Sequence, residues 1–234
     1  MIYVTGDLHG ELDIGKLNSR RFPHNRSLTK DDLVIVAGDF GLVWGNGKDE
    51  TYWRKWLSRK NFTTLFIDGN HENFDLLDAY PVEYWNGGKV HRIADDILHL
   101  MRGQVFTIQD LKLFTFGGAA SHDKAYRKEH VSWWPREMPS AEEYAEGLAN
   151  LARHNGKVDY ILTHTCPTSI LERLNDQEPT GIEKDELTEY LESVKRSTAY
   201  KAWGFGHFHR DLPLPGGFRL LYHDVKRLTE LGER

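Results

Sequence analysis

The sequence predicts an α/β protein with mixed β-sheets. Short apolar runs alternate with helical patterns through most of the 234 residues, which is the order of elements found in α/β folds. The early apolar runs are almost continuous, as expected for strands that are buried on both faces. Two later stretches begin with the side-chain pair that caps the first turn of a helix.

These patterns predict the elements in chain order. Strands are expected at residues 2–5, 33–37, 64–67, 113–116, 160–163 and 218–222. Helices are expected at residues 11–19, 51–59 and 73–80, and after two capping pairs, Ser140 with Glu143 and Thr180 with Glu183. Gly156 predicts the end of the helix that follows Ser140, because glycine readily adopts the backbone conformation that ends a helix.

The length fits a single domain over residues 1–234 or, less naturally, two small domains, and we predict the single domain. Hydrophobic residues make up 39% and charged residues 28%, which suffices for a buried core. The net charge of -5 argues against binding of long duplex nucleic acid. The single cysteine, Cys166, excludes an intrachain disulfide and suits a reducing compartment. No apolar run reaches the roughly 20 residues of a membrane span, and a strand at residue 2 leaves no room for a signal peptide, so we expect a cytoplasmic protein.

One segment stands out by its composition. Residues 121–139 combine many charged side chains with Trp133, Trp134 and Pro135. Because tryptophan is rarely left exposed and fills tight cores poorly, we predict a cap or groove wall around residues 119–156. The alternative is a loop that its tryptophans attach to the body of the protein.

Five short motifs follow strand-like runs and carry nine side chains that can bind a metal or transfer a proton. The motifs are Asp7-Leu8-His9, Gly38-Asp39, Gly69-Asn70-His71-Glu72, Thr163-His164 and Gly206-His207-Phe208-His209. Sheets of α/β proteins gather their ligands at such strand ends. Asp7 and His9 are two residues apart, as are His207 and His209, and such pairs point to one face of a strand. Each motif alone is common, but the five together predict a metal site.

The chemistry of these side chains predicts two transition-metal ions. Seven of them offer a carboxylate oxygen, an amide oxygen or an imidazole nitrogen: Asp7, His9, Asp39, Asn70, His164, His207 and His209. This mixture suits manganese, which we favour, or iron, zinc, nickel or cobalt, whereas magnesium and calcium prefer oxygen ligands alone. Seven ligands fit two ions about 3.5–4 Å apart if one carboxylate bridges them, and such a pair activates a bridging water. His71 then remains free to donate a proton to a leaving oxygen.

This set of motifs, which spans Tyr3 to His209, resembles the calcineurin-like metallophosphoesterase superfamily. The resemblance implies a four-layer αββα sandwich of two mixed sheets flanked by helices, with a dinuclear site at the strand ends. It places Asp7, His9, Asp39 and His209 at a first metal, and Asp39, Asn70, His164 and His207 at a second metal. It also implies that metal-bound hydroxide attacks the phosphorus of a phosphate ester while His71 assists the leaving group.

The residues after Asp39 differ from those of the protein phosphatases in this superfamily. Those enzymes read Gly-Asp-x-x-Asp-Arg-Gly, and the second Asp orients the catalytic histidine while the Arg clamps the phosphate. This chain has Leu42 and Val43 at the two positions. We therefore do not expect protein phosphatase activity of that type.

Other residues must then fill the two roles. Asp68 and Glu72 flank the catalytic histidine and are candidates to orient it, although Glu72 is also an ordinary residue for the start of a helix. A substitute phosphate clamp is expected in the unusual segment, where His122 also stands out. The candidate substrate contacts are Trp44, His122, Lys124, Arg127 and Arg136.

The expected activity is hydrolysis of phosphodiesters or small phosphomonoesters. Tryptophans 44, 133 and 134 favour nucleotide-containing substrates, because stacking contributes roughly 1–3 kcal/mol per base. Two alternatives are a nuclease for short single strands and a non-catalytic scaffold, although a scaffold would not need the full set of ligands. Cys166 is next to His164 but has no dedicated base, so we interpret it as a small buried residue rather than a nucleophile.

Overall fold

The computed structural model describes residues 1–45 and 47–233 and contains two mixed β-sheets. In this part of the chain, seven strands form the first sheet, in the order β13 (Lys226–Arg227), β1 (Ile2–Thr5), β2 (Leu33–Ala37), β3 (Thr63–Ile67), β6 (Ile97–Leu100), β5 (Gly88–Ala94) and β4 (Val82–Trp85). Six strands form the second sheet, in the order β11 (Leu212–Leu214), β12 (Phe218–Leu220), β10 (Ala202–Phe205), β9 (Tyr160–Thr163), β8 (Leu111–Phe116) and β7 (Gln104–Ile108).

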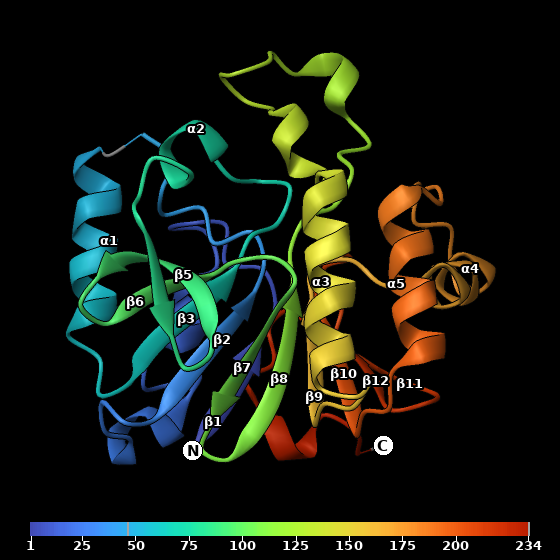
Figure 1. Ribbon diagram of the computed structural model, residues 1–234. Coiled ribbons are helices and arrows are strands. Elements are labelled where there is room, and N and C mark those ends of the chain that lie inside the picture. Colours follow the sequence, from blue (N-terminus) through green and yellow to red (C-terminus); the bar gives the residue numbers. More distant parts are fainter. Residues whose placement is uncertain (46, 234) are drawn as a thin grey trace.

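Helices cover the outer sides of the two sheets (Figure 1). The α-helices of the described residues are α1 (Lys48–Ser58), α2 (Phe74–Leu77), which lies beyond the ends of the strands, α3 (Ala141–Arg153), α4 (Thr168–Gln177) and α5 (Glu186–Ser197). Helix α1 lies on the outer side of the first sheet, and α3, α4 and α5 lie beside the second sheet. This arrangement confirms the expected αββα sandwich. None of the helices in the described residues is long and apolar enough to cross a membrane.

Alternate residues of the central strands belong to different hydrophobic cores. In β1, Val4 packs between the two sheets with Phe106 and Leu162, whereas Tyr3 packs on the outer side of the first sheet with Phe22. A third core joins the second sheet to α3, α4 and α5. Because both faces of these strands are covered, every residue of β1, β2 and β9 is buried, which explains their continuous apolar sequences.

The predicted strands are all present, and three of them have the predicted bounds. Strands β1, β2 and β9 match the prediction, while β3, β8 and β12 differ from it at their ends. The sequence patterns did not reveal β4 to β7, β10, β11 or β13. Strand β10 reads Ala-Trp-Gly-Phe, and its small residues have weak strand propensity, so its place between β9 and β12 comes from tertiary packing.

The helix predictions were correct in part. The capping box of Ser140 and Glu143 is present at the start of α3. The second predicted capping pair is wrong, because α5 begins after Asp185, and the Thr180 hydroxyl instead donates to Asn175 in the turn after α4. Residues 11–19 do not form an α-helix and contain only a short 3-10 turn, Ile14–Leu17.

The 3-10 turn has a tertiary cause. The ammonium group of Lys16 is buried and donates hydrogen bonds to the backbone carbonyls of Gly6, Asp7 and Tyr222. Because these carbonyls belong to the loops that follow the central strands, Lys16 holds the turn against the end of the first sheet. Contacts of this kind override a local helical pattern.

The unusual segment divides into two parts. Residues 141–153 are α3, which packs beside the second sheet, whereas residues 119–140 form a loop that stands above the sheets, at the top of Figure 1. The loop is attached by Trp134, which is buried and whose Nε1 donates to Asp75 at 2.8 Å. The assignment of a single domain with a cap at residues 119–156 stays a prediction.

Candidate metal centre

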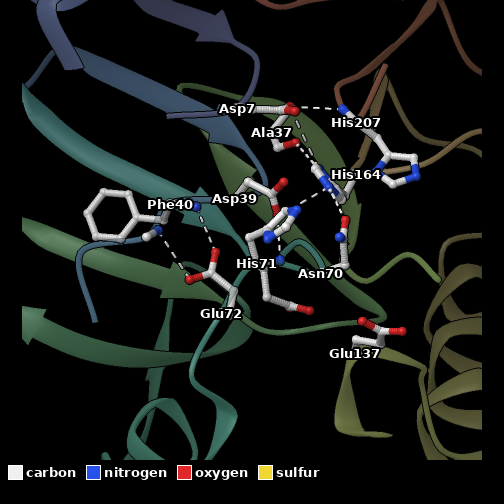
Figure 2. A network of polar contacts seen from close by, with 12 residues as sticks. Asp7, Ala37, Asp39, Phe40, Asn70, His71, Glu72, Glu137, His164 and His207 are labelled. Atoms are coloured by element: carbon white, nitrogen blue, oxygen red, sulfur yellow. Dashed lines mark hydrogen bonds and ion pairs between the residues drawn. The ribbon is translucent and has the colours of Figure 1, made fainter. Parts of the chain in front are cut away.

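The seven proposed ligands meet where five strands end, and Figure 2 shows five of them, Asp7, Asp39, Asn70, His164 and His207. Asp7 and His9 follow β1, Asp39 follows β2 and Asn70 follows β3. The other three come from the second sheet, where His164 follows β9, and His207 and His209 follow β10. Strands β1, β2 and β3 are parallel to one another, as are β9 and β10. The loops that follow the strands of each group therefore lie at one edge of their sheet.

The backbone at this edge is not extended. His9, Asp39, His207 and His209 all have positive φ angles, between 44° and 72°. The expectation that Asp7 and His9 share a strand face is therefore wrong, since both lie in the loop that follows β1. Left-handed conformations are unfavourable for residues with a Cβ atom, and when several occur together they indicate a functional site.

Two glycines allow the close approach of these loops. A Cβ atom on Gly38 would lie 1.9 Å from Nδ1 of His164, and one on Gly69 would lie 2.0 Å from Oδ1 of Asp39. No real Cβ atom tolerates such contacts, so both positions require glycine. The sequence pattern Gly-Asp and Gly-Asn thus reflects packing of ligand against backbone as well as turn formation.

The residues expected at the first metal form a compact cluster. One ligand atom from each of Asp7, His9, Asp39 and His209 lies within 4.8 Å of the other three. Nε2 of His9 is 3.3 Å from Oδ2 of Asp39, and Nε2 of His209 is 3.1 Å from Oδ2 of Asp7. Nδ1 of His9 contacts Asp13 at 2.8 Å, so a carboxylate orients this imidazole from behind.

The residues expected at the second metal converge on the other side of Asp39. Nε2 of His164 lies 3.3 Å from Oδ1 of Asp39 and 3.2 Å from Oδ1 of Asn70. Nδ1 of His164 is 2.8 Å from the carbonyl oxygen of Ala37. A carbonyl only accepts, so Nδ1 carries the proton and Nε2 faces the cluster. The ring of His207 lies 4.9 Å from that of His164, between centroids. Asp39 therefore contacts both groups, as a bridging ligand must.

Two buried atoms indicate that the cluster is built to hold cations. Nε2 of His207 is buried and has no hydrogen-bond partner among the residues that the structure describes, and Oδ2 of Asp7 is buried with only the ion-pair contact to Nε2 of His209. Buried polar atoms normally have partners, and exceptions indicate an unobserved ion or a functional role. The donor set of carboxylates, an amide and imidazoles fits two transition-metal ions.

The electrostatics of the cluster agree with this interpretation. Burial raises the pKa of Asp39, but the neighbouring His164 and His9 hold it well below its ordinary value. Burial lowers the pKa of His164 and His9, but Asp39 outweighs it and raises these pKa values to about 10 and about 9. Burial and the nearby His164 lower the pKa of His207 to about 3, so His207 remains a neutral imidazole with a free lone pair. Negative charge at the centre thus favours cations.

The proposed orienting residues of His71 have other contacts. Asp68 is buried against His99 at 3.1 Å and Arg102 at 2.8 Å. Glu72 accepts hydrogen bonds from the backbone amides of Phe40 at 2.7 Å and Gly41 at 3.3 Å, which holds the loop after Asp39 (Figure 2). Within the described residues neither carboxylate contacts His71, so this hypothesis is wrong. Helix α2 begins after Asn73, so Glu72 is not its cap either.

Burial explains a further property of Glu72. Burial and the charge of Asp39 raise the pKa of Glu72 to about 8, although the two amide hydrogen bonds oppose the shift. Glu72 is therefore a buried residue that holds the loop after Asp39 through hydrogen bonds to two backbone amides.

The guanidinium of Arg127 contacts the imidazole of His71. Its Nη1 lies 3.1 Å from Nδ1 of His71, and its Nη2 lies 3.5 Å from Nε2. Asp123 holds the same guanidinium with contacts of 2.7 and 2.8 Å. Burial lowers the pKa of His71, Asp39 opposes this shift, and the positive Arg127 adds to it.

The structure places the other candidate substrate contacts differently. His122 lines the cavity beside the metal cluster. Arg136 is paired with Glu143 at 2.8 Å and lies against α2. Trp44 lines a second hollow, and its ring packs edge to face on that of Trp134, with 5.2 Å between centroids. Lys124 lies on an exposed 3-10 turn.

A cavity of about 300 Å³ opens directly onto the cluster. Besides the metal-site residues and His122, its walls are formed by residues that the sequence analysis did not propose for the site: Glu178, Pro179, Thr180, Ile182, Phe208 and Arg210. Phe208 could have been noticed, because it lies between the two histidines of its motif. Residues 178–182 carry no metal-binding or catalytic motif and reach the site only through the fold.

The sandwich and the ligands at its strand ends define the class of metal-dependent hydrolases. The family model of the calcineurin-like phosphoesterases matches residues 1–211, and the chain belongs to this family of dinuclear metal-dependent enzymes. It is therefore a phosphoric ester hydrolase.

Individual relatives are more distant. The chain is 26% identical over 189 residues to lariat debranching enzyme A of Xenopus laevis and 27% identical over 190 residues to lariat debranching enzyme of Homo sapiens. These matches cover 72% of this chain but 33% of each relative, so the chain spans about a third of their length. A solved phosphopantetheinyl hydrolase from Mycobacterium tuberculosis aligns with 100% of this chain and 92% of its own, at 19% identity and a TM-score of 0.43, which is too distant to inform the substrate.

Proposed function

We propose that this phosphoesterase hydrolyses compact organic phosphate esters, both diesters and small monoesters, with nucleotide-containing esters as the favoured class. The observation that carries this proposal is the cavity of about 300 Å³ beside the clustered ligands. Its volume is at the lower end of small-molecule sites. A compact ester fits such a space, and a long duplex does not.

The proposed metal ligands are Asp7, His9, Asp39, Asn70, His164, His207 and His209. Two divalent ions, with Mn²⁺ as the first to test, would lower the pKa of a bridging water and neutralise charge on the phosphate. His71 lies in the cavity wall beside Asp39 and Asn70. We assign its protonated imidazolium form the role of donating a proton to the leaving oxygen, and the lowered pKa makes this form a strong acid that is populated more as the pH falls.

Arg127 is the proposed phosphate clamp. Val43 stands where the protein phosphatases have their clamping arginine, and it carries no charge. The guanidinium of Arg127, from the loop at residues 119–140, lies beside His71 and supplies a positive charge there. Arginine recognises phosphate through several donors at once. The role of the missing arginine thus passes to a segment far away in the sequence.

The organic part of the ester would lie against an apolar wall. Pro179, Ile182 and Phe208 line the cavity, and an ion pair of 3.2 Å between Arg210 and Glu178 lies at the same place. An aromatic ring next to a phosphate site suits a nucleobase, because each base offers a flat face for stacking. Trp134 is buried and Trp44 lines a different hollow, whereas Phe208 lines the cavity, so Phe208 is the proposed stacking residue.

Cleavage of a short single-stranded nucleic acid is the second candidate function. It is favoured by the likeness to relatives named lariat debranching enzymes. Because the chain spans about a third of their length, their activity is a proposal here and not a conclusion.

The protein loaded with Mn²⁺ tests the proposal against bis-p-nitrophenyl phosphate, p-nitrophenyl phosphate, a dinucleotide and a short single strand. We expect hydrolysis of at least one chromogenic ester and of the dinucleotide. Binding of two ions without hydrolysis of any of the four would refute the proposed function.

A further inference from the structure

Asn70 can serve as a metal ligand in one orientation only. Its side chain ends in an oxygen, which can bind a metal, and an NH₂ group, which cannot. A rotation of the amide by 180° exchanges the oxygen and the NH₂ group, and both orientations occupy almost the same space. Something in the protein must therefore determine which end faces His164, whose Nε2 lies 3.2 Å from Oδ1 of Asn70.

The orientation follows from a buried chain of hydrogen bonds behind Asn70. The carboxylate of Glu137 accepts from the backbone N–H of Ser121 at 2.9 Å and from its hydroxyl at 2.6 Å. An ionised carboxylate only accepts, so the hydroxyl proton of Ser121 points to Glu137. The oxygen of this hydroxyl then accepts from Nδ2 of Asn70 at 3.1 Å. The amide oxygen of Asn70 must face the opposite way, toward the metal cluster (Figure 2).

All three side chains are well shielded from water. Asn70, Ser121 and Glu137 are 6%, 3% and 1% exposed. Water therefore competes little for their hydrogen bonds, and each proton has few alternative acceptors. The direction in which these protons point is set by the protein itself.

Glu137 is itself fixed relative to β3. Arg102 donates to the backbone carbonyl of Glu137 at 3.1 Å and, through its Nε, to Asp68 at 2.8 Å. Asp68 directly follows β3 and precedes Asn70 by two residues. The end of the loop at residues 119–140 is thus tied twice to the segment that carries Asn70.

We propose that Ser121 and Glu137 are positioning residues that hold the amide oxygen of Asn70 toward the second metal. The inference rests on the proposed function in one respect, that Asn70 is a metal ligand. It adds that the loop at residues 119–140, far from the metal motifs in sequence, completes the metal site from behind.

The variant Glu137→Gln tests the direction of these hydrogen bonds, because glutamine has almost the same shape as glutamate. The backbone N–H of Ser121 needs an acceptor, so the glutamine oxygen stays there and its NH₂ group faces the Ser121 hydroxyl. That hydroxyl must then donate its proton to Asn70. We expect the amide of Asn70 to turn over and to present NH₂ to the second metal.

Glu192→Gln is a matched control. Glu192, on α5, also accepts from the backbone N–H and the hydroxyl of one serine, Ser169, at 3.1 and 2.6 Å. Its other contacts are with Lys195 and Arg196 on the same helix. The control removes the same kind of charge and leaves the metal cluster untouched.

Calorimetric titration of each full-length variant with Mn²⁺ gives the number and affinity of the bound ions. Wild type and Glu192→Gln should bind two ions, and Glu137→Gln should bind the second ion about 10- to 100-fold more weakly, as is typical when a partner of a metal ligand is lost. A Glu137→Gln protein that binds both ions with wild-type affinity would overturn the inference. Failure of the wild type to bind two ions would instead contradict the proposed function.

Two further variants exclude a general loss of structure as the cause. Ser121→Ala removes the acceptor of Nδ2 of Asn70 and should also weaken the binding of the second ion. Asn70→Asp, introduced into the Glu137→Gln variant, should restore binding of the second ion, because both ends of a carboxylate are oxygen atoms. If Glu137→Gln fails to fold, Ser121→Ala decides, and wild-type affinity in that variant refutes the inference.

Discussion

Arg127 and His71 are 56 residues apart in sequence, yet Nη1 of Arg127 lies 3.1 Å from Nδ1 of His71. The contact brings a positive charge to the edge of the metal cluster. It also explains how the site could function without the arginine that protein phosphatases have after Asp39. The predictions below begin with this pair.

Arg127→Met should lower kcat by about 100-fold if the guanidinium contacts the phosphate, since removal of one such donor typically has an effect of this size. Steady-state kinetics with bis-p-nitrophenyl phosphate measure it. Lys124→Met, on the exposed turn of the same loop, is the control and should stay near wild type. Equal rates in Arg127→Met and Lys124→Met would contradict the clamp.

Phe208→Ala should raise KM for nucleotide-containing esters about 5- to 150-fold, the loss expected when one stacked base loses its partner. KM for a short alkyl phosphate should change little, because such a substrate offers no ring to stack. Parallel kinetics with the two substrates measure the difference. A similar change for both would show that Phe208 supports the loop and not the base.

Mn²⁺ should stabilise the protein. An ion that binds only the folded state adds about 2.7 kcal/mol at 100 times its Kd, which corresponds to a rise in Tm of roughly 5–10 °C for a domain of this size. Differential scanning calorimetry with Mn²⁺ or with EDTA measures it. Asp39→Ala should remove most of the rise, because Asp39 contacts both groups of ligands. The same rise in that variant would place the stabilising ion elsewhere.

Gly69→Ala should disrupt the metal centre, because the new Cβ atom would lie 2.0 Å from Oδ1 of Asp39. We expect weaker binding of both ions, measured by calorimetric titration, together with a lower Tm. Gly15→Ala is the matched control, since a Cβ atom there has nothing within 4 Å. Unchanged metal binding in Gly69→Ala would show that Asp39 can move without loss of the site.

The buried pair of His91 and His99 predicts a pH dependence of stability. Their Nδ1 atoms are 3.2 Å apart, and burial, with the neighbouring His99, lowers the pKa of His91 from 6.5 to about 4. Between these values the unfolded chain binds the proton and the folded chain does not, so stability falls as the pH decreases from 6.5 to 4. The loss is of the order of 1–3 kcal/mol. Urea unfolding at several pH values measures it.

His91→Asn provides the comparison for that experiment. This variant lacks the titrating imidazole, so its free energy of unfolding should vary less with pH over the same interval. An equally steep dependence in wild type and variant would assign the effect to other groups.

Much of this protein was predictable because its signals are local in the sequence. The strand β2 is a run of five apolar residues, and Asp39 follows it after a glycine. Parallel strands bring such positions together, so the composition of the metal cluster followed without knowledge of side-chain positions. The start of α3 was equally local, because Ser140 and Glu143 cap the helix between themselves.

Other features have no local signal. Strand β10 is held by its neighbours, and the turn around Lys16 is held by carbonyls from three separate residues. The hypothesis that Asp68 or Glu72 orients His71 failed because closeness in sequence does not fix where a side chain points. Asp68 turns to Arg102, and Glu72 turns to backbone amides.

The sequence alone therefore determined the family, the fold and the kinds of ligand atoms, because each of the five motifs at strand ends consists of residues that are close together in the sequence. The tertiary structure decided what surrounds them. It brings Arg127 to His71 and Ser121 to Asn70, residues that are 56 and 51 positions apart in the sequence, and it places Glu137 behind Ser121. Such contacts depend on the path of a whole loop and on buried hydrogen bonds that only the complete fold can shield from water.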